Sequence, residues 1–449
     1  MLSFPDIKKA PIELSKIESV CDALATDFFR DNHYRASHLS MTASENYPSR
    51  FVRTMGAGMQ GAFYEFAPPY FEEHGEWHFP DSGAQSALVQ KLTRIGCEGF
   101  RAQTFDWRPN GGAAAEQAVL LGTCSRGDAF VHFAHSDGGH SSLEELARKV
   151  GIGIFHLPVR ADDLLIDVER LAQLVASHPE IRMVMLDQSF KLRWQPLAAI
   201  RSVLPPAVLL AYDASHDAGL ILGGVVPQPL EEGADVLLGN THKTIPGPQK
   251  GFVAFGNAEH PQLKSVSDWV CPLMQSNSHA ELLAPFYLAM VEMSLFGRPY
   301  AQQIVKNAKV LALCLRAEGL QVAGESFGYT ETHQVHVTIG SPQDALHMAS
   351  NALARAGVRC NNIEIPGSGG RHGLRLGVQA LTRRGITEVD MATVARFIAR
   401  VVLRREPPDA IRHEVALFLR SFPLNPLHYS LDSQYDAPHG VRLREEVFA

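Results

Sequence analysis

The chain has 449 residues, of which 45% are hydrophobic and 20% charged, and its formal net charge is −7. This length exceeds the usual size of a single core, so we expect a large domain and a smaller one. The sequence has no basic run, which argues against nucleic acid or an anionic membrane as a partner. It shows no export signal and no apolar stretch long enough to span a bilayer, and its six cysteines are scattered. These features together predict a cytoplasmic protein.

Residues 13–34 carry apolar positions at helical spacing and predict an amphipathic N-terminal arm over residues 1–36. From about residue 100 to 260, apolar strand-like runs alternate with helix-like stretches. The strand-like runs are DAFVHFA, GIFHLPV, RMVMLDQ, AVLLAYD, ADVLLGN and GFVAFG. Because near-continuous apolar strands separated by helices indicate a sheet buried on both faces, we predict an α/β domain over residues 37–290. Its sheet should be doubly wound and mostly parallel.

A second α/β pattern follows, in which the strands HQVHVTI and GLRLGV alternate with two helix-like stretches. We therefore place a domain boundary near residue 290, so that residues 291–449 form a smaller C-terminal α/β domain. In doubly wound sheets, ligands bind at the carboxyl ends of the strands. The residues with the strongest chemical signal fall at those ends.

Lys243 lies just past a predicted buried strand, in the segment GNTHKTIPGPQKG that begins at Gly239. A lysine in this place can form a Schiff base if its surroundings lower its pKa. The alternative is a surface lysine in a loop.

Asp213 ends the preceding predicted strand, so Asp213 and Lys243 are expected in one crevice. A pyridoxal phosphate (PLP) site needs a carboxylate at the pyridine nitrogen, because the protonated ring is a strong electron sink. His216, three residues later, could touch the ring hydroxyl. The alternative for Asp213 is a turn or capping role.

The stretch from Asn110 to Glu116 reads NGGAAAE and opens a predicted helix. Glycines at a helix N-terminus leave backbone N–H groups free to bind a phosphate, assisted by the helix dipole. An ordinary glycine turn before a helix is the alternative.

Three histidines, His132, His135 and His140, lie close together in the sequence. Their spacing fits no standard zinc pattern and no cysteine joins them, so we predict no metal site. His140 follows a Gly-Gly turn and suits an imidazole stacked on a planar ring, whereas His132 lies inside a strand and is predicted to be structural.

Arg375 lies in a predicted strand of the second domain, where a fixed guanidinium could clamp a substrate carboxylate bidentately. The nearby Arg383 and Arg384 are expected to be solvated or to form structural ion pairs.

Six motifs in this order resemble serine hydroxymethyltransferase and its relatives, the fold-type-I PLP-dependent transferases. The likeness runs from about residue 38 to 400. The motifs are TASEN at 42–46, AHSDGGH at 134–140, YDASH at 212–216 followed by AG at 218–219, THKT at 241–244, LRLG at 374–377 and TRRG at 382–385.

The resemblance implies a PLP cofactor and a role for each matching residue. The implied roles are Lys243 as the Schiff-base lysine, Asp213 on the ring nitrogen, His140 stacked on the ring, Ser189 and His216 at the ring hydroxyl, His242 beside the cofactor, the turn Gly111, Gly112 and Ala113 at the phosphate, and Arg375 and Ser44 at the substrate carboxylate. It also implies a homodimer with shared sites, in which Tyr64 and the segment with Ser276 and Asn277 reach the neighbouring subunit's cofactor.

The chain departs from that family in telling places. The Ser-Gly-Ser of the family's phosphate turn is Gly111-Gly112-Ala113 here, and an asparagine of the following helix is Glu116. The family's acid/base glutamate, two residues after a tyrosine, is Phe66, with Glu65 one position away. These departures, together with segments 76–80, 105–112, 186–197 and 242–251, resemble the L-threonine transaldolases of natural-product pathways, including the one leading to obafluorin.

The second resemblance implies that L-threonine is cleaved to acetaldehyde and a stabilised glycyl carbanion. The carbanion then adds to a second, aromatic aldehyde to give a new β-hydroxy-α-amino acid. Candidates for handling the hydroxyl proton are Tyr64, Glu116, Glu65 and His140. A folate-dependent hydroxymethyltransferase, a threonine aldolase and a non-enzymatic PLP-binding protein remain as alternatives.

Overall fold

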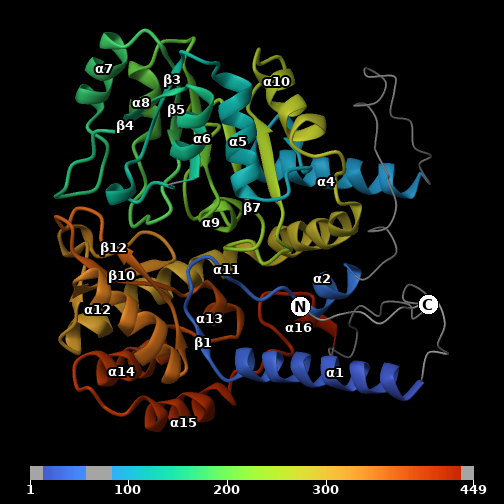
Figure 1. Cartoon of the computed structure of the whole chain (residues 1–449), viewed down its shortest axis with the longest axis vertical. Helices are drawn as coiled ribbons and strands as arrows, with labels where there is room; N and C mark the ends of the chain where they lie inside the picture. Colours follow the sequence, from blue (N-terminus) through green and yellow to red (C-terminus); the bar gives the residue numbers. More distant parts are fainter. Residues whose placement is uncertain (1–13, 57–82, 141, 436–449) are drawn as a thin grey trace.

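The computed structural model describes residues 14–56, 83–140 and 142–435. It contains a seven-stranded sheet and a four-stranded sheet, and the helix α11 (Leu283–Ala317) runs between them (Figure 1).

The seven-stranded sheet forms the core of the larger part. Strand β8 runs antiparallel to both of its neighbours and the remaining pairs are parallel. The predicted α/β fold with a mostly parallel sheet is therefore confirmed. The strand order is β2 (Thr104–Asp106), β8 (Gly251–Phe255), β7 (Val236–Asn240), β6 (Leu209–Asp213), β5 (Ile181–Leu186), β3 (Ala129–His132) and β4 (Gly153–His156).

Helices cover both faces of this sheet, which explains why its central strands are mostly apolar. Along β6, Leu209 and Ala211 pack in the cluster that includes α5 (Gly112–Thr123), whereas Leu210 and Tyr212 pack in the cluster on the opposite face. Alternation of side chains along a strand sends successive residues to these two cores. The surrounding helices are α4 (Ala84–Phe100), α6 (Ser142–Val150), α7 (Val168–Ser177), α8 (Leu197–Val203), α9 (Ala218–Leu222) and α10 (Leu263–Asp268).

The second sheet is antiparallel and forms the smaller layer. Its order is β12 (Asn361–Glu364), β13 (His372–Gly377), β10 (Gln334–Gly340) and β9 (Gln321–Val322). The accompanying helices are α12 (Pro342–His347), α13 (Gln379–Arg383), α14 (Met391–Val402) and α15 (Pro408–Leu419).

Two features join the layers across the predicted boundary near residue 290. Helix α11 passes through that residue without a break and contacts α4 and α9 of the larger layer and α14 of the smaller one. Strand β1 (Leu39–Ser40) pairs with β11 (Val358–Arg359), so residues that the sequence analysis assigned to the large domain lie in the small layer. One continuous helix therefore holds the two layers together.

Helix α11 is also long and apolar enough, by length and composition, to cross a membrane, which the sequence analysis did not anticipate. Half of its apolar window is buried inside the protein, where it packs against helices of both layers. Packing in the interior accounts for its apolar composition.

Candidate active site

Lys243 and Asp213 follow the carboxyl ends of two paired parallel strands, β7 and β6. Lys243 Nζ lies 3.3 Å from Nε2 of His216, which is itself buried. Burial lowers the pKa of Lys243 to about 8, although the charge of Asp213 acts in the opposite direction. The amine is therefore partly neutral, and nucleophilic, near physiological pH.

Lys250, a buried lysine seven residues further on, has a different environment. Its Nζ donates hydrogen bonds to the carbonyl oxygens of Arg108 (2.7 Å) and Ser278 (2.8 Å). These bonds tie the loop before the glycine turn to the loop after α10. Lys250 is thus a structural residue, and its partners distinguish it from Lys243.

Glu116 and Asp213 are both buried, with 3% and 6% of their surfaces exposed. Burial raises the pKa of Glu116 well above its usual range, and repulsion by Asp213 raises it further. Both effects favour the neutral carboxylic acid form of Glu116, which can donate a proton. Its Oε2 lies 3.5 Å from Nδ1 of His140, which also lies 2.7 Å from the hydroxyl of Ser142.

His140 is held at the backbone as well, because its N–H donates to Oδ2 of Asp187 at 3.3 Å. Burial lowers the pKa of this imidazole, while the charge of Asp213 opposes that change. Burial also lowers the pKa of His216 well below its ordinary value and that of His242 to about 4. The site therefore presents neutral imidazoles around Lys243.

Arg375 is buried, and its hydrogen bonds within the described part of the chain go to neutral groups. Its Nε donates to Oδ1 of Asn361 (3.2 Å) and its Nη1 to the carbonyl of Ser189 (3.1 Å), while the ring centroid of Phe190 lies 5.1 Å away. Burial lowers its pKa to about 10, so it stays charged at neutral pH. Within the described residues no carboxylate pairs with it, so this guanidinium is available to an anion.

The motif at 42–46 lies against Lys243, although it is distant in the sequence. Asn46 Nδ2 donates to the carbonyl of Lys243 (2.6 Å) and to the hydroxyl of Tyr300 (2.9 Å). The carbonyl of Ala43 is 3.1 Å from Nε2 of His333. Ser44 lies between these two anchored residues, so the structure brings it to the edge of the site. The sequence analysis missed the positioning roles of Asn46, Tyr300 and His333.

The glycine turn begins α5 as predicted. The N-cap residue Gly111 has no side chain to cap this helix, and the N–H of Gly112 donates instead to Oδ1 of Asn240, the last residue of β7 (2.7 Å). A Cβ atom at Gly112 would lie 2.5 Å from Asn240 Nδ2 and 2.8 Å from Ser215 Oγ, so glycine is required there. The first-turn N–H groups beyond Gly112, including that of Ala113, suit a phosphate. Asn240 and Ser215 were not foreseen.

The remaining predicted residues lie at the edge of the described site or outside it. Ser276 is exposed, and its neighbour Gln275 donates to the carbonyl of Arg108 at 2.8 Å, close to the glycine turn. Asn277 accepts a hydrogen bond from the N–H of His279. Tyr64, Glu65, Phe66 and the segment 76–80 lie outside the described residues.

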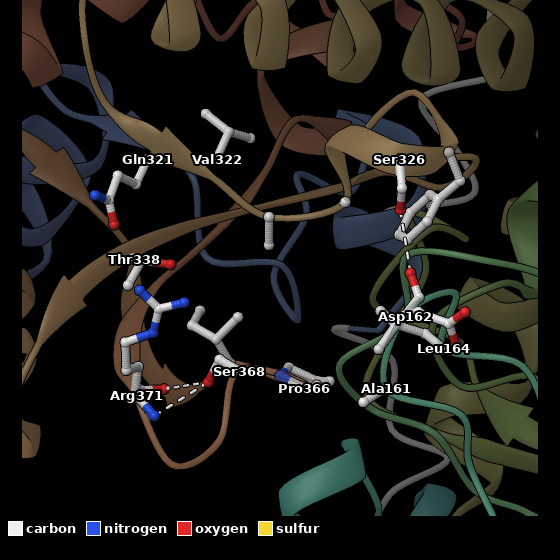
Figure 2. A pocket seen from close by; sticks show the side chains of 15 residues that line it. Ala161, Asp162, Leu164, Gln321, Val322, Ser326, Thr338, Pro366, Ser368 and Arg371 are labelled. Atoms are coloured by element: carbon white, nitrogen blue, oxygen red, sulfur yellow. Dashed lines mark hydrogen bonds between the residues drawn. The ribbon is translucent and has the colours of Figure 1, made fainter.

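A separate cavity of about 220 Å³ lies where the loop with Asp162 meets β9, β10 and the loop from Pro366 to Arg371 (Figure 2). A hydrogen bond from Ser326 Oγ to the carbonyl of Asp162 joins its two sides, and Ser368 and Arg371 bond to each other within one side. None of the predicted site residues that the structure describes lines this cavity.

The groups around Lys243 match the chemical parts of PLP and an amino acid. A lysine with a lowered pKa suits the aldehyde, a buried carboxylate suits the ring nitrogen, and the first-turn N–H groups of α5 beyond Gly112 suit the phosphate. The guanidinium of Arg375, which has no carboxylate partner among the described residues, suits a substrate carboxylate. At the carboxyl ends of a doubly wound sheet, this combination defines a fold-type-I PLP-dependent transferase, and the chain binds pyridoxal 5'-phosphate.

Comparison with known proteins narrows that class. The serine hydroxymethyltransferase family model matches residues 18–398, and the chain belongs to this family. Serine hydroxymethyltransferase of Thermococcus gammatolerans is 33% identical over 93% of this chain and 97% of its own length, and that of Methanopyrus kandleri is 33% identical over 86% and 89%. The crystal structure of L-threonine transaldolase from Pseudomonas fluorescens in its internal aldimine state is 52% identical, covers 97% of both chains and superposes with a TM-score of 0.92.

Proposed function

We propose that the chain is an L-threonine transaldolase, which transfers the glycyl unit of L-threonine to a second, aromatic aldehyde. The observation that carries this proposal is the 52% identity to an L-threonine transaldolase over 97% of both chains. The hydroxymethyltransferases above reach 33%. The replacement of the family's acid/base glutamate by Phe66 supports the same choice.

In the proposed reaction, PLP supplies the electron sink that stabilises negative charge at the α-carbon of the amino acid. Lys243 holds the cofactor, and Asp213 keeps the proton on its ring nitrogen. Arg375 binds the carboxylate of L-threonine and thereby orients the Cα–Cβ bond for cleavage.

A base removes the proton of the β-hydroxyl, the Cα–Cβ bond breaks, and the carbon–oxygen double bond of acetaldehyde forms. The electron pair stays at the α-carbon and forms the new bond to the second aldehyde, whose oxygen takes up a proton. Glu116 is our structural candidate for exchanging this proton, because burial and the nearby Asp213 raise its pKa and favour the protonated form, and its Oε2 lies 3.5 Å from His140. Tyr64, Glu65 and His140 are the other candidates.

We further propose a cytoplasmic homodimer. Helix α1 (Leu14–Ala36) runs along one side of the molecule (Figure 1), and Val20, Leu24 and Phe28 recur on it every fourth residue. These side chains are 54–69% exposed, an apolar stripe that a second copy would cover. Phe28→Glu should convert dimers to monomers in sedimentation and weaken PLP retention on dilution. Full PLP occupancy in a demonstrated monomer would contradict the shared sites.

The function is tested with a panel of aldehydes. The purified enzyme, with L-threonine and no folate, should release acetaldehyde and give mass-spectrometric products that contain each aromatic aldehyde plus a glycyl unit. Release of acetaldehyde with glycine as the sole amino-acid product would instead identify a threonine aldolase. Conversion of serine to glycine that requires tetrahydrofolate, without use of aromatic aldehydes, would identify a hydroxymethyltransferase.

A further inference from the structure

Three metal-ligating side chains meet at the far edge of the large sheet, on elements that the proposed function does not use. His132 ends β3 and His156 ends β4, and the two residues are register partners in the parallel pair. Register partners project from the same face of a sheet, so the two imidazoles lie side by side. Glu144, on α6, faces them.

The ligand atoms have the spacing of a metal site. Oε1 of Glu144 lies 3.6 Å from Nε2 of His132 and 3.2 Å from Nε2 of His156, and the ligand atoms of the three residues all lie within 4.8 Å of one another. Ligands about 2.0–2.1 Å from a tetrahedral zinc ion are themselves about 3.3 Å apart. Small shifts of the exposed His156 ring therefore suffice to close the site.

A buried polar atom without a partner points into this cluster. His132 is 1% exposed, and its Nε2 has no hydrogen-bond partner within the described part of the chain. Its other nitrogen, Nδ1, lies 3.0 Å from Oδ2 of Asp187. When Nδ1 donates to Asp187, Nε2 carries a lone pair that faces Glu144. A carboxylate that accepts from one ring nitrogen of a histidine orients the other nitrogen toward a metal ion.

One carboxylate oxygen of Glu144 stays directed at the imidazoles although an arginine pairs with the other oxygen. Arg148 pairs with Oε2 of Glu144 and leaves Oε1 toward the two imidazoles. His156 is 48% exposed, which gives an ion and its water ligands a path from solvent.

We propose that His132, Glu144 and His156 bind a divalent transition metal of the zinc type, with the fourth position open to water or a small anion. Two imidazoles and one carboxylate are donors that suit zinc, nickel and copper rather than magnesium or calcium. The prediction of no metal site rested on the sequence spacing of His132, His135 and His140. The true neighbours of His132 lie on another strand and on a helix.

The site adjoins the cofactor loop through Asp187. This carboxylate lies within hydrogen-bond distance of His132 and accepts hydrogen bonds from the backbone N–H groups of Phe133 (3.1 Å) and His140. An ion on His132 is thus one side chain away from the loop that carries His140.

The test is zinc binding to the tag-free PLP-loaded enzyme, measured by calorimetry, with Co²⁺ absorption as a probe of coordination. Wild type should bind one zinc ion per chain at this site, and Glu144→Gln and His156→Ala should each weaken binding at least tenfold. The matched control is His178→Ala, because His178 also pairs with a glutamate, Glu180 at 3.1 Å, but belongs to no three-ligand group that the structure describes. Its zinc affinity should equal that of wild type.

Two results would overturn the proposal. One is no zinc uptake by the wild-type enzyme. The other is zinc affinity that His156→Ala and Glu144→Gln leave unchanged, which would place the ion elsewhere and leave this cluster a hydrogen-bonded group only. Both variants change residues at or near the surface, and a circular dichroism spectrum matching wild type would show that they fold.

Discussion

Two buried arginines eight residues apart show how the same side chain serves stability in one region and ligand binding in another. Arg383 forms an ion pair with the buried Glu292 and donates to the carbonyl oxygens of Tyr47 and Tyr429. Arg375 has an amide oxygen, a carbonyl oxygen and an aromatic ring as partners, and no described carboxylate.

The difference between their partners shows which buried arginine can bind a ligand. A buried charge is tolerated when an opposite charge and hydrogen bonds compensate it, as at Arg383. At Arg375 the compensation is incomplete, so an anion from outside completes the site. Lys250 and Lys243 repeat the contrast, because Lys250 donates to carbonyl oxygens whereas Lys243 contacts a neutral imidazole.

The largest effect is expected for Lys243→Ala. The variant should lose at least 10⁴-fold in activity, about 5.5 kcal/mol of barrier, because the residue that bonds the cofactor is gone. Borohydride should fix PLP to the wild-type chain and not to the variant, as read from the mass of the intact protein. Cofactor still fixed to the variant chain would assign the Schiff base to another lysine, with Lys250 the first to test.

Arg383→Met should destabilise the protein by about 3–5 kcal/mol, because it leaves Glu292 buried without a partner. Urea denaturation measures this loss. The double variant Arg383→Met/Glu292→Leu is the matched control and should recover most of it. If Arg383→Met were as stable as wild type, the ion pair with Glu292 would not stabilise the fold.

Arg375→Ala should lower kcat/KM for L-threonine by about 30- to 700-fold, or about 2–4 kcal/mol, with little or no loss of stability. Removing a buried charge that lacks a carboxylate partner leaves no stranded ion, in contrast to Arg383. PLP absorbance should remain, because Arg375 acts on the substrate. An unchanged KM and kcat would show that another residue binds the substrate carboxylate.

The smallest effect concerns pH. Because the pKa of Lys243 is lowered to about 8, its neutral fraction should rise about tenfold from pH 7 to pH 9 and then level off. The initial rate at which the apoenzyme rebinds PLP should follow this curve. The rate at which free lysine reacts with PLP should instead keep rising toward pH 10. An enzyme rate that tracks free lysine would contradict the depressed pKa.

Much of the fold was predictable, because local pattern determines it. The apolar runs that became β3 and β5 to β8 are largely buried. Parallel strands bring their carboxyl ends together, so Asp213 and Lys243 could be placed in one crevice from sequence. Local pattern did not predict β1, because its two residues pair with β11 far along the chain. Nor did it show that α11 would run unbroken across the domain boundary.

The parts of the site that could not be predicted depend on contacts between distant segments. Asn46 bonds the Lys243 carbonyl, Asn240 bonds Gly112, and His333 contacts Ala43, and no spacing rule connects these pairs. The sequence left Arg383 and Arg384 either solvated or in structural ion pairs. The structure buries both, and Arg383 pairs with Glu292, a partner that the spacing along the chain does not indicate.

The transaldolase function is tested most directly by following the atoms of L-threonine. L-Threonine labelled with ¹⁵N and with ¹³C at C1 and C2 is incubated with the enzyme and benzaldehyde in the absence of folate. The predicted product is a phenyl-substituted β-hydroxy-α-amino acid that carries all three labels, with an unlabelled β-carbon from the aldehyde. Labelled glycine and acetaldehyde alone, or no turnover until serine and tetrahydrofolate are supplied, would contradict the assignment.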